Sequence, residues 1–126
     1  MLVLLADDDD ELRYILARVL RKEGYDVEEI SDIDALSRRL SRYDRSNEGK
    51  HRRMVLVTDV YMPGGNAIDA VGAIKHKLEK LPFIFITSAK DAEVTRKGLA
   101  LGADAVLSKP VDMDHLKQLL RRIFEG

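Results

Sequence analysis

Five short apolar segments, separated by stretches with helical periodicity, constrain the fold of this chain more than any other feature. The apolar segments are expected to form strands at residues 2–6, 27–30, 54–58, 83–87 and 105–107. Strands that are almost wholly apolar are buried on both faces, and strands that alternate with helices form parallel sheets. The pattern therefore predicts an α/β fold, in which a five-stranded parallel sheet lies between two layers of helices.

The segments between the expected strands carry apolar residues at helical spacing. In the first segment these residues occupy positions 12, 15, 16, 19 and 20, and in the last they occupy positions 116, 119, 120 and 123. Gly24 and Gly102 follow two of these segments, where glycine commonly ends a helix. A chain of 126 residues with 45% hydrophobic content suits one compact core, so we expect residues 1–126 to form a single domain.

The composition of the chain limits the kinds of molecule that we expect it to bind. The 21 basic and 22 acidic residues give a net charge of −1, so no strong overall field attracts nucleic acid or a membrane. The absence of cysteine excludes disulfides, thiol catalysis and cysteine metal sites. The first apolar segment is too short for a signal peptide and lacks a basic leader, and no later segment is long enough to cross a bilayer. We therefore expect a cytoplasmic protein with neither a nucleic-acid nor a membrane partner.

One polar stretch, residues 43–53, is longer than a usual connection between a helix and a strand. Its basic cluster at positions 50–53 could contact nucleic acid or an acidic partner. Acidic residues at positions 44 and 48 dilute that charge, so a solvated surface loop is the favoured interpretation. The histidines His51, His76 and His115 have no ligand spacing and are expected at the surface.

Acidic side chains and a lysine follow three of the expected strands. Asp7 and Asp8 come directly after the first strand, Asp59 after the third, and Lys109 after the fifth. Ligands of parallel sheets gather beyond the carboxyl ends of the strands, so these side chains are expected to converge there. Two ionised carboxylates roughly 5 Å apart repel by about 3 kcal/mol at an effective dielectric constant of about 20. Carboxylates that need a cation, without His or Cys ligands, favour Mg²⁺ or Mn²⁺.

The lysine adds a second positive charge to this predicted site. A carboxylate beside a divalent cation and a lysine is well placed to attack phosphorus, because the cations offset the repulsion between two anionic reactants. The product would be an aspartyl phosphate. Asp9 and Asp10, by contrast, are interpreted as favourable charges at the start of a helix.

Four sequence blocks resemble the signature blocks of response-regulator receiver domains. They are ADDDDELR, LVTDVYMPGG, FITSAKD and LSKP. The blocks occur in the family's order and at the expected strand ends, and the resemblance covers nearly the whole chain. It implies a doubly wound, flavodoxin-like parallel sheet with strand order 2-1-3-4-5 and helices on both faces.

The resemblance also implies the roles of the acidic residues. Asp59 matches the residue that accepts the phosphoryl group. Asp8 would bind Mg²⁺ directly and Asp7 would orient the ion, while Asp59 and the backbone carbonyl of Tyr61 would complete the ligands. Mn²⁺ could replace Mg²⁺ at such a site.

The later blocks supply the groups that would contact phosphate. Thr87 matches the residue whose hydroxyl binds the phosphoryl group, and Lys109 matches the lysine that bridges phosphate and the acidic pocket. The resemblance further implies a cis peptide bond between Lys109 and Pro110, which proline makes accessible at about 0.5–1 kcal/mol.

The function implied by the resemblance is two-component signalling. A phosphohistidine on a sensor kinase or a phosphotransfer protein would donate the phosphoryl group, and the phosphorylated domain would switch a protein-binding surface or relay the phosphate. The domain would be a phosphoacceptor rather than an enzyme, acting as a monomer or a phosphorylation-dependent dimer. Because the sequence stops after the last expected helix, we expect a stand-alone receiver with an unidentified downstream protein.

Two positions are expected to affect how this domain signals. Val106 stands where receivers usually carry an aromatic switch residue. A valine has one side-chain torsion and no ring to move, so the signal is expected to travel through shifts of loops and helices. Tyr61, two residues after Asp59, is expected to shade an acyl phosphate from water and to slow its hydrolysis.

Two alternatives remain open at this point. The chain could be a binding module that is never phosphorylated, although the complete set of acidic residues, Thr87 and Lys109 argues against this. It could also be a small phosphatase of the haloacid-dehalogenase type, which uses an aspartyl nucleophile and magnesium. Such enzymes typically carry an acid two residues after the nucleophile, where this chain has Tyr61, and no segment here resembles their cap.

Overall fold

A computed structural model describes residues 1–43, 53–78, 81–88 and 92–126 of the chain. Most of the stretch expected to form a long polar loop, including His51, lies outside these described residues, so its predicted exposure stays a prediction. Among the described residues, no helix has both the length and the apolar character needed to span a membrane.

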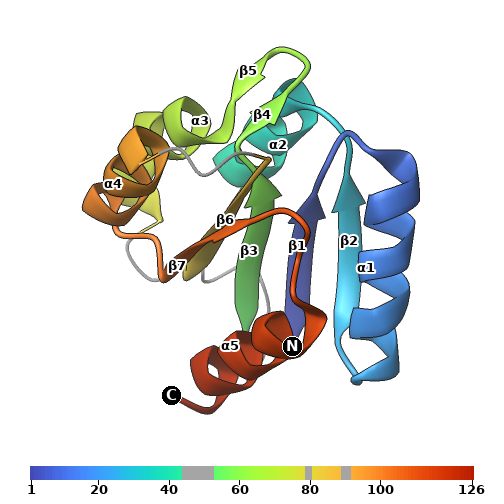
Figure 1. Cartoon of the computed structure of the whole chain (residues 1–126). Coiled ribbons are helices and arrows are strands. Elements are labelled where there is room, and N and C mark those ends of the chain that lie inside the picture. The colour runs from blue at the N-terminus through green and yellow to red at the C-terminus, as the bar shows by residue number, and fades with distance from the viewer. Residues whose placement is uncertain (44–52, 79–80, 89–91) are drawn as a thin grey trace.

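The centre of the fold is a parallel sheet of five strands (Figure 1). Its strands are β1 (Leu2–Ala6), β2 (Asp26–Ile30), β3 (Met54–Asp59), β6 (Phe83–Thr87) and β7 (Ala105–Ser108). They lie side by side in the order β2-β1-β3-β6-β7. Counted along the chain within this sheet, that is the order 2-1-3-4-5, so the predicted doubly wound fold is confirmed.

Helices cover both faces of the sheet. They are α1 (Asp10–Lys22), α2 (Ile33–Ser41), α3 (Ala67–Ala73), α4 (Ala92–Leu101) and α5 (Met113–Glu125), with a short 3₁₀ helix, η1 (Lys75–Lys77), after α3. Buried residues of α1 and α5 share one core cluster, and those of α2, α3 and α4 share the other. The two clusters lie on opposite faces of the sheet, which gives the three layers seen in Figure 1.

Strand β1 shows why a central strand of this sheet is apolar at every position. Val3 and Leu5 contribute to the core beneath α1 and α5, whereas Leu2 and Leu4 contribute to the core on the other face. All four are buried, because successive side chains of a strand point to opposite faces of the sheet. Every position of a central strand in a three-layer fold is therefore a core position.

The edge strand β2 is less apolar than its neighbours and is stabilised differently. Glu28 pairs with Arg39 of α2 at 2.7 Å, and Glu29 pairs with Arg13 of α1 at 3.3 Å. The acidic side chains of this strand thus alternate between the helices on the two faces.

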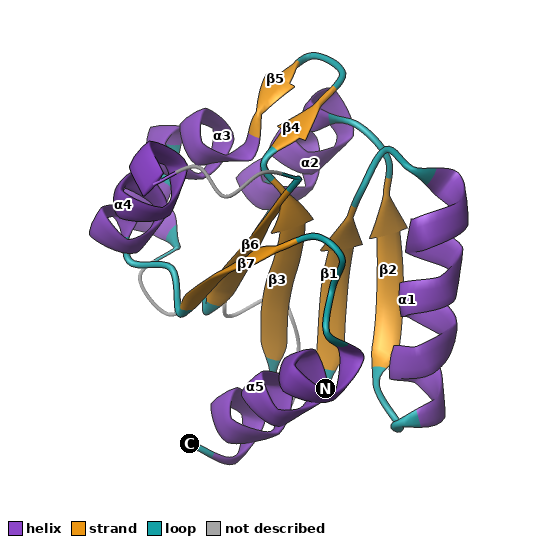
Figure 2. Ribbon diagram, in the orientation of Figure 1, coloured by secondary structure: helices purple, strands orange, loops and turns teal. Residues whose placement is uncertain are grey.

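A small antiparallel hairpin was not predicted from the sequence. Its strands, β4 (Tyr61–Met62) and β5 (Gly65–Asn66), have two residues each and lie outside the main sheet (Figure 2). Gly64 has a φ of +100°, a conformation that favours glycine. The amide of Ile33 at the start of α2 donates to Pro63 O at 3.1 Å, which attaches the hairpin to that helix.

Candidate functional site

The turn between β1 and α1 places the first two acidic residues. Asp7 follows β1 directly and is 1% exposed, whereas Asp8 is exposed. The Oδ1 atom of Asp7 accepts a hydrogen bond from the amide of Asp9 at 2.9 Å. Asp9 is the N-cap of α1, and its side chain accepts from the amide of Leu12 at 3.1 Å. The predicted helix-start role of Asp9 is thereby confirmed.

The other two predicted groups meet at the same edge of the sheet. Asp59 ends β3 and is 6% exposed. Lys109 follows β7, and its Nζ lies 3.0 Å from Asp59 Oδ2 and 3.7 Å from Asp7 Oδ2. The backbone amide of Lys109 donates to Thr87 O at 2.8 Å, which fixes the lysine to the end of β6. The peptide bond between Lys109 and Pro110 is cis, as the resemblance implied.

The carboxylates are close enough to share one cation. One oxygen from each of Asp7, Asp8 and Asp59 lies within 4.8 Å of the others. Asp7 Oδ2 is buried and accepts no hydrogen bond from the residues that the structure describes, which is costly for an ionised oxygen. Three hard oxygen ligands with room left for water and phosphate oxygens suit Mg²⁺. These residues therefore fit a magnesium site.

The electrostatics of the site also favour an added positive charge. Burial raises the pKa of Asp59 above its ordinary value, and although the hydrogen bond and charge of Lys109 oppose this, the charges of Asp7 and Asp8 reinforce it. Burial alone would lower the pKa of Lys109, but its hydrogen bond to Asp59 and the charges of the three aspartates raise it overall. The lysine is thus held as a cation beside a carboxylate that is not fully compensated.

Thr87 is placed at this edge by the register of the sheet. It ends β6, where it pairs with Ser108, and the preceding residue Ile86 pairs with Asp59. Thr87 is 3% exposed. Thr87 therefore lies in the row of strand ends that includes Asp59, and Lys109 follows the neighbouring strand. Contact between the Thr87 hydroxyl and a phosphoryl group stays a prediction.

Residues 3–121 match the family described as the response regulator receiver domain. The chain belongs to this family. It is 31% identical over 125 residues to the sensor protein EvgS of Escherichia coli K12, covering 98% of this chain and 10% of that protein. It is 32% identical over 120 residues to the DNA-binding transcriptional regulator NtrC of Rhizobium meliloti, covering 95% of this chain and 23% of that protein. The chain thus spans less than a quarter of the length of these two relatives.

Solved receiver domains agree with this fold. The non-phosphorylated HemR receiver domain of Leptospira biflexa superposes with a TM-score of 0.82 at 28% identity, covering 99% of this chain and 94% of that chain. The predicted family and the predicted fold are both confirmed.

The structure also places other positions singled out in the sequence. Tyr61 begins β4 and is 57% exposed. Val106 lies half-buried on β7. His76 and His115 are exposed, as predicted. The role of the Tyr61 carbonyl as a metal ligand stays a prediction.

Sequence analysis missed Arg13 as a residue of this site. Its Nη1 donates to the backbone oxygen of Asp7 at 2.6 Å, and its side chain is 14% exposed. The signal in the sequence was its place three residues after Asp10, a spacing that brings two side chains together on a helix. That spacing predicts an ion pair with Asp10, but it does not show that the arginine also reaches back to the preceding turn.

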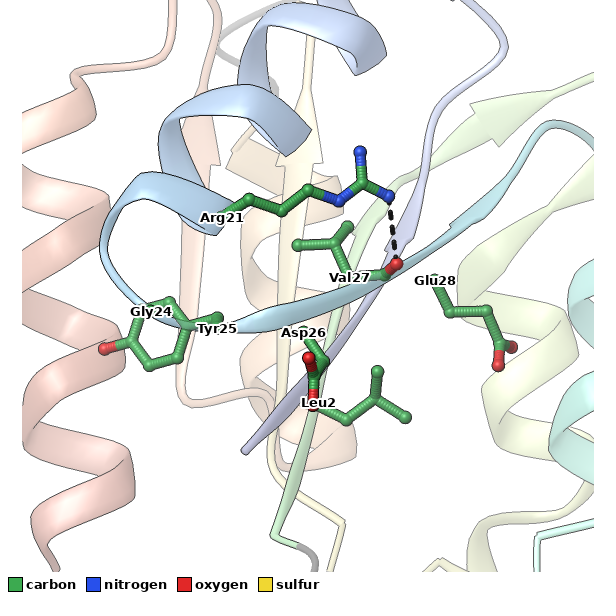
Figure 3. Close-up of a pocket in the computed structure, with 7 residues that line it drawn as sticks. All are labelled: Leu2, Arg21, Gly24, Tyr25, Asp26, Val27 and Glu28. Carbon is green, nitrogen blue, oxygen red and sulfur yellow. Dashed lines mark hydrogen bonds between the residues drawn. The ribbon is translucent and has the colours of Figure 1, made fainter.

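A pocket at the other end of β1 and β2 belongs to a different part of the domain (Figure 3). Its lining residues are Leu2, Arg21, Gly24, Tyr25, Asp26, Val27 and Glu28. It includes the first residues of both strands, whereas the acidic site lies beyond their last residues. The pocket contains none of the predicted site residues.

Proposed function

We propose that this receiver domain accepts a phosphoryl group on Asp59 in a magnesium-dependent reaction. The observation that carries the proposal is the lysine ammonium 3.0 Å from Asp59 Oδ2, beside a cluster of three carboxylates that fits a divalent cation. A carboxylate in this setting can approach an anionic phosphoryl group, because positive charges offset the repulsion between them.

In the proposed reaction, a carboxylate oxygen of Asp59 attacks the phosphorus of a phosphohistidine. An O–P bond forms while the P–N bond breaks, and the imidazole leaves with the bonding electron pair and takes up a proton. Lys109 stays protonated and offsets charge on the phosphoryl oxygens. The Thr87 hydroxyl donates to one of these oxygens. Asp7, Asp8 and Asp59 would hold Mg²⁺, which would supply further neutralisation of the phosphoryl charge.

The domain is proposed to be a signalling phosphoacceptor and not an enzyme with a separate substrate. It would catalyse only its own phosphorylation and dephosphorylation. The proposed donor is a sensor histidine kinase or a histidine phosphotransfer protein. Similar domains occur within a sensor protein and within a DNA-binding transcriptional regulator, which supports both a relay role and an output role.

The test is the intact mass of the protein after incubation with phosphoramidate, a small P–N phosphodonor, with MgCl₂ or with EDTA. We expect one phosphoryl adduct that requires Mg²⁺ and is absent from Asp59→Asn. Asp69→Asn, at an exposed position in the first turn of α3, is the matched control and should form the adduct. An adduct on Asp59→Asn, or none on the folded wild type, would contradict the proposal, and repeated turnover of a phosphomonoester would favour a phosphatase.

A further inference from the structure

We propose that Arg13 is a positioning residue for the magnesium site, because it holds the turn that carries Asp7 and Asp8. This inference rests on the proposed function, since it concerns the affinity of that same site for Mg²⁺. Arg13 acts through the backbone: within the part of the chain that the structure describes, its side-chain hydrogen bonds go to the Asp7 backbone oxygen, Asp10 and Glu29, and none goes to a carboxylate expected to bind the ion.

A single guanidinium connects three separate parts of the fold. Its Nη1 donates to the backbone oxygen of Asp7 at 2.6 Å, and its Nη2 donates to Asp10 Oδ1 at 2.7 Å. Its Nε donates to Glu29 Oε1 at 3.3 Å. Each nitrogen therefore has its own partner, one in the turn, one in the first turn of α1 and one on the edge strand β2.

These contacts matter because the turn is otherwise held by few bonds. The amide of Asp7 donates to Ile30 O at 3.0 Å, which ties the turn to the end of β2. Asp7 Oδ1 accepts from the amide of Asp9, while Oδ2 is buried without a hydrogen bond. The charge of Lys109, whose Nζ lies 3.7 Å from Oδ2, and the bond from the Asp9 amide to Oδ1 both act on this carboxylate. Its position also depends on the backbone of Asp7, and Arg13 bonds the carbonyl of that residue.

Fixing this backbone keeps the carboxylate oxygens of the cluster near one another before an ion binds. Ligands that are already in place lose less freedom on binding, and groups behind the ligands commonly change metal affinity by about 10–100-fold. The guanidinium spreads its donors over three nitrogens in a rigid planar fork, and here each nitrogen reaches a different partner. The three donors of a lysine share one nitrogen and cannot reproduce this fixed geometry. The geometry of Arg13, and not only its charge, is therefore the proposed determinant.

Arg21 provides a matched control on the same helix. Its Nη2 lies 3.3 Å from the other oxygen of Glu29. The same nitrogen donates to Val27 O at 3.1 Å, the bond drawn in Figure 3. Its hydrogen bonds therefore go to β2, in contrast to the Arg13 bond to Asp7. Removing either arginine takes one cation away from Glu29. Of the two, only Arg13 also bonds the Asp7 backbone, so only its loss frees the turn between β1 and α1.

The experiment is calorimetric titration of MgCl₂ into the full chain, after EDTA treatment, for wild type, Arg13→Gln, Arg13→Lys and Arg21→Gln. We expect the Mg²⁺ dissociation constant to rise about 10-fold in Arg13→Gln and to rise clearly in Arg13→Lys. Arg21→Gln should bind like the wild type. Urea unfolding of each variant in EDTA reports stability without metal, so a general loss of stability is measured separately from a loss of affinity.

The outcomes separate this inference from the proposed function. If the wild type binds Mg²⁺ and Arg13→Gln binds equally well, the positioning role is overturned while the metal site stands. Full affinity in Arg13→Lys would also overturn it, because charge alone would then suffice. A wild type that binds no Mg²⁺ would overturn both. If Arg13→Gln does not fold, Glu29→Gln, which removes a charged anchor of the arginine, must weaken Mg²⁺ binding for the inference to stand.

Discussion

Opposing electrostatic effects meet at Asp59. It is almost fully buried and lies near the carboxylates of Asp7 and Asp8, and Lys109 offsets part of its negative charge. Burial and the neighbouring negative charges outweigh the lysine, so the pKa of Asp59 is raised. Without a metal ion, the folded state is therefore less stable than it would be with a neutral side chain at this position.

We predict that Asp59→Asn stabilises the metal-free domain by on the order of 1 kcal/mol, since the substitution removes the charge and keeps the shape. The measurement is urea unfolding in EDTA. Asp114→Asn, at an exposed position in the first turn of α5, is the control and should be neutral or slightly destabilising. An Asp59→Asn variant that is clearly less stable than the wild type would show that the pair with Lys109 dominates.

The raised pKa of Asp59 also predicts that the stability difference between Asp59→Asn and the wild type depends on pH. A raised pKa means that Asp59 binds its proton more tightly in the folded state than in the unfolded state. Protonated Asp59 therefore favours the folded state at low pH, and this contribution to stability is lost as the pH rises through the folded pKa. The stability advantage of Asp59→Asn should therefore be small below about pH 4 and should grow above it. Unfolding curves in EDTA at several pH values measure this difference, and an advantage that grows on acidification would have the wrong sign.

Tyr61 bears on the lifetime of the phosphorylated state. It lies two residues after Asp59, begins a short hairpin strand and is exposed. We predict that Tyr61→Ala loses its phosphoryl group several-fold faster than the wild type, because the ring no longer shades the acyl phosphate from water. Tyr61→Phe keeps the ring and should decay at the wild-type rate. Loss of the mass adduct over time measures both, and equal decay of Tyr61→Ala would refute the shading role.

The individual residues of the site were more predictable than the contacts that organise them. Asp7, Asp8, Asp59 and Lys109 could be found because each follows an apolar strand, and parallel strands end at one edge. The bond from Arg13 to the backbone of Asp7 depends on the direction in which the turn leaves the strand. Hydrophobic periodicity carries no information about that direction.

Among the helices and strands, the pattern of apolar residues predicted those elements whose positions depend on burying side chains. Central strands and amphipathic helices bury side chains in a regular order, so their positions were visible in the sequence. The hairpin of β4 and β5 buries few residues, and its strands are too short to show alternation. Its position depends on local turn chemistry at Gly64 and on the bond between Ile33 and Pro63.

Helix α4 packs closely on the sheet at Gly98, so a larger side chain there should lower stability. A Cβ at Gly98 would lie 2.9 Å from Val106 Cγ2 and 3.0 Å from Phe85 Cδ2. We therefore expect Gly98→Ala to lower the free energy of unfolding by about 1–3 kcal/mol through overpacking. Adding Val106→Ala should recover part of this loss, because it removes one of the two contacts. Denaturant unfolding of the single and double variants measures the coupling.

Gly72 is the control for helix propensity in this comparison. It lies on α3, where an added Cβ would meet Leu101 Cδ1 at 3.9 Å, an ordinary contact. Gly72→Ala should therefore stabilise the domain by up to about 1 kcal/mol. If both alanine variants were stabilising, α4 would not be packed closely against Val106 and Phe85.

At the scale of the whole molecule, metal binding and folding stability are linked. An ion that binds only the folded state stabilises it by about 2.7 kcal/mol at a concentration 100 times its dissociation constant. We predict that MgCl₂ raises the thermal unfolding midpoint of the wild type, and that NaCl at equal ionic strength does not. Asp8→Asn, which removes an exposed ligand, should show little of this rise. An equal rise in the variant would place the ion elsewhere.

Phosphorylation of Asp59 can be tested by identifying which aspartate carries the phosphoryl group. An acyl phosphate is reduced by borohydride, which converts the aspartate that carried it into homoserine. The protein is incubated with phosphoramidate and MgCl₂, reduced, digested and sequenced by mass spectrometry. We predict homoserine at position 59, only in the sample with Mg²⁺ and phosphodonor. Homoserine at another aspartate, or none at position 59 in a folded protein that carries a phosphoryl adduct, would show that Asp59 is not the phosphoacceptor.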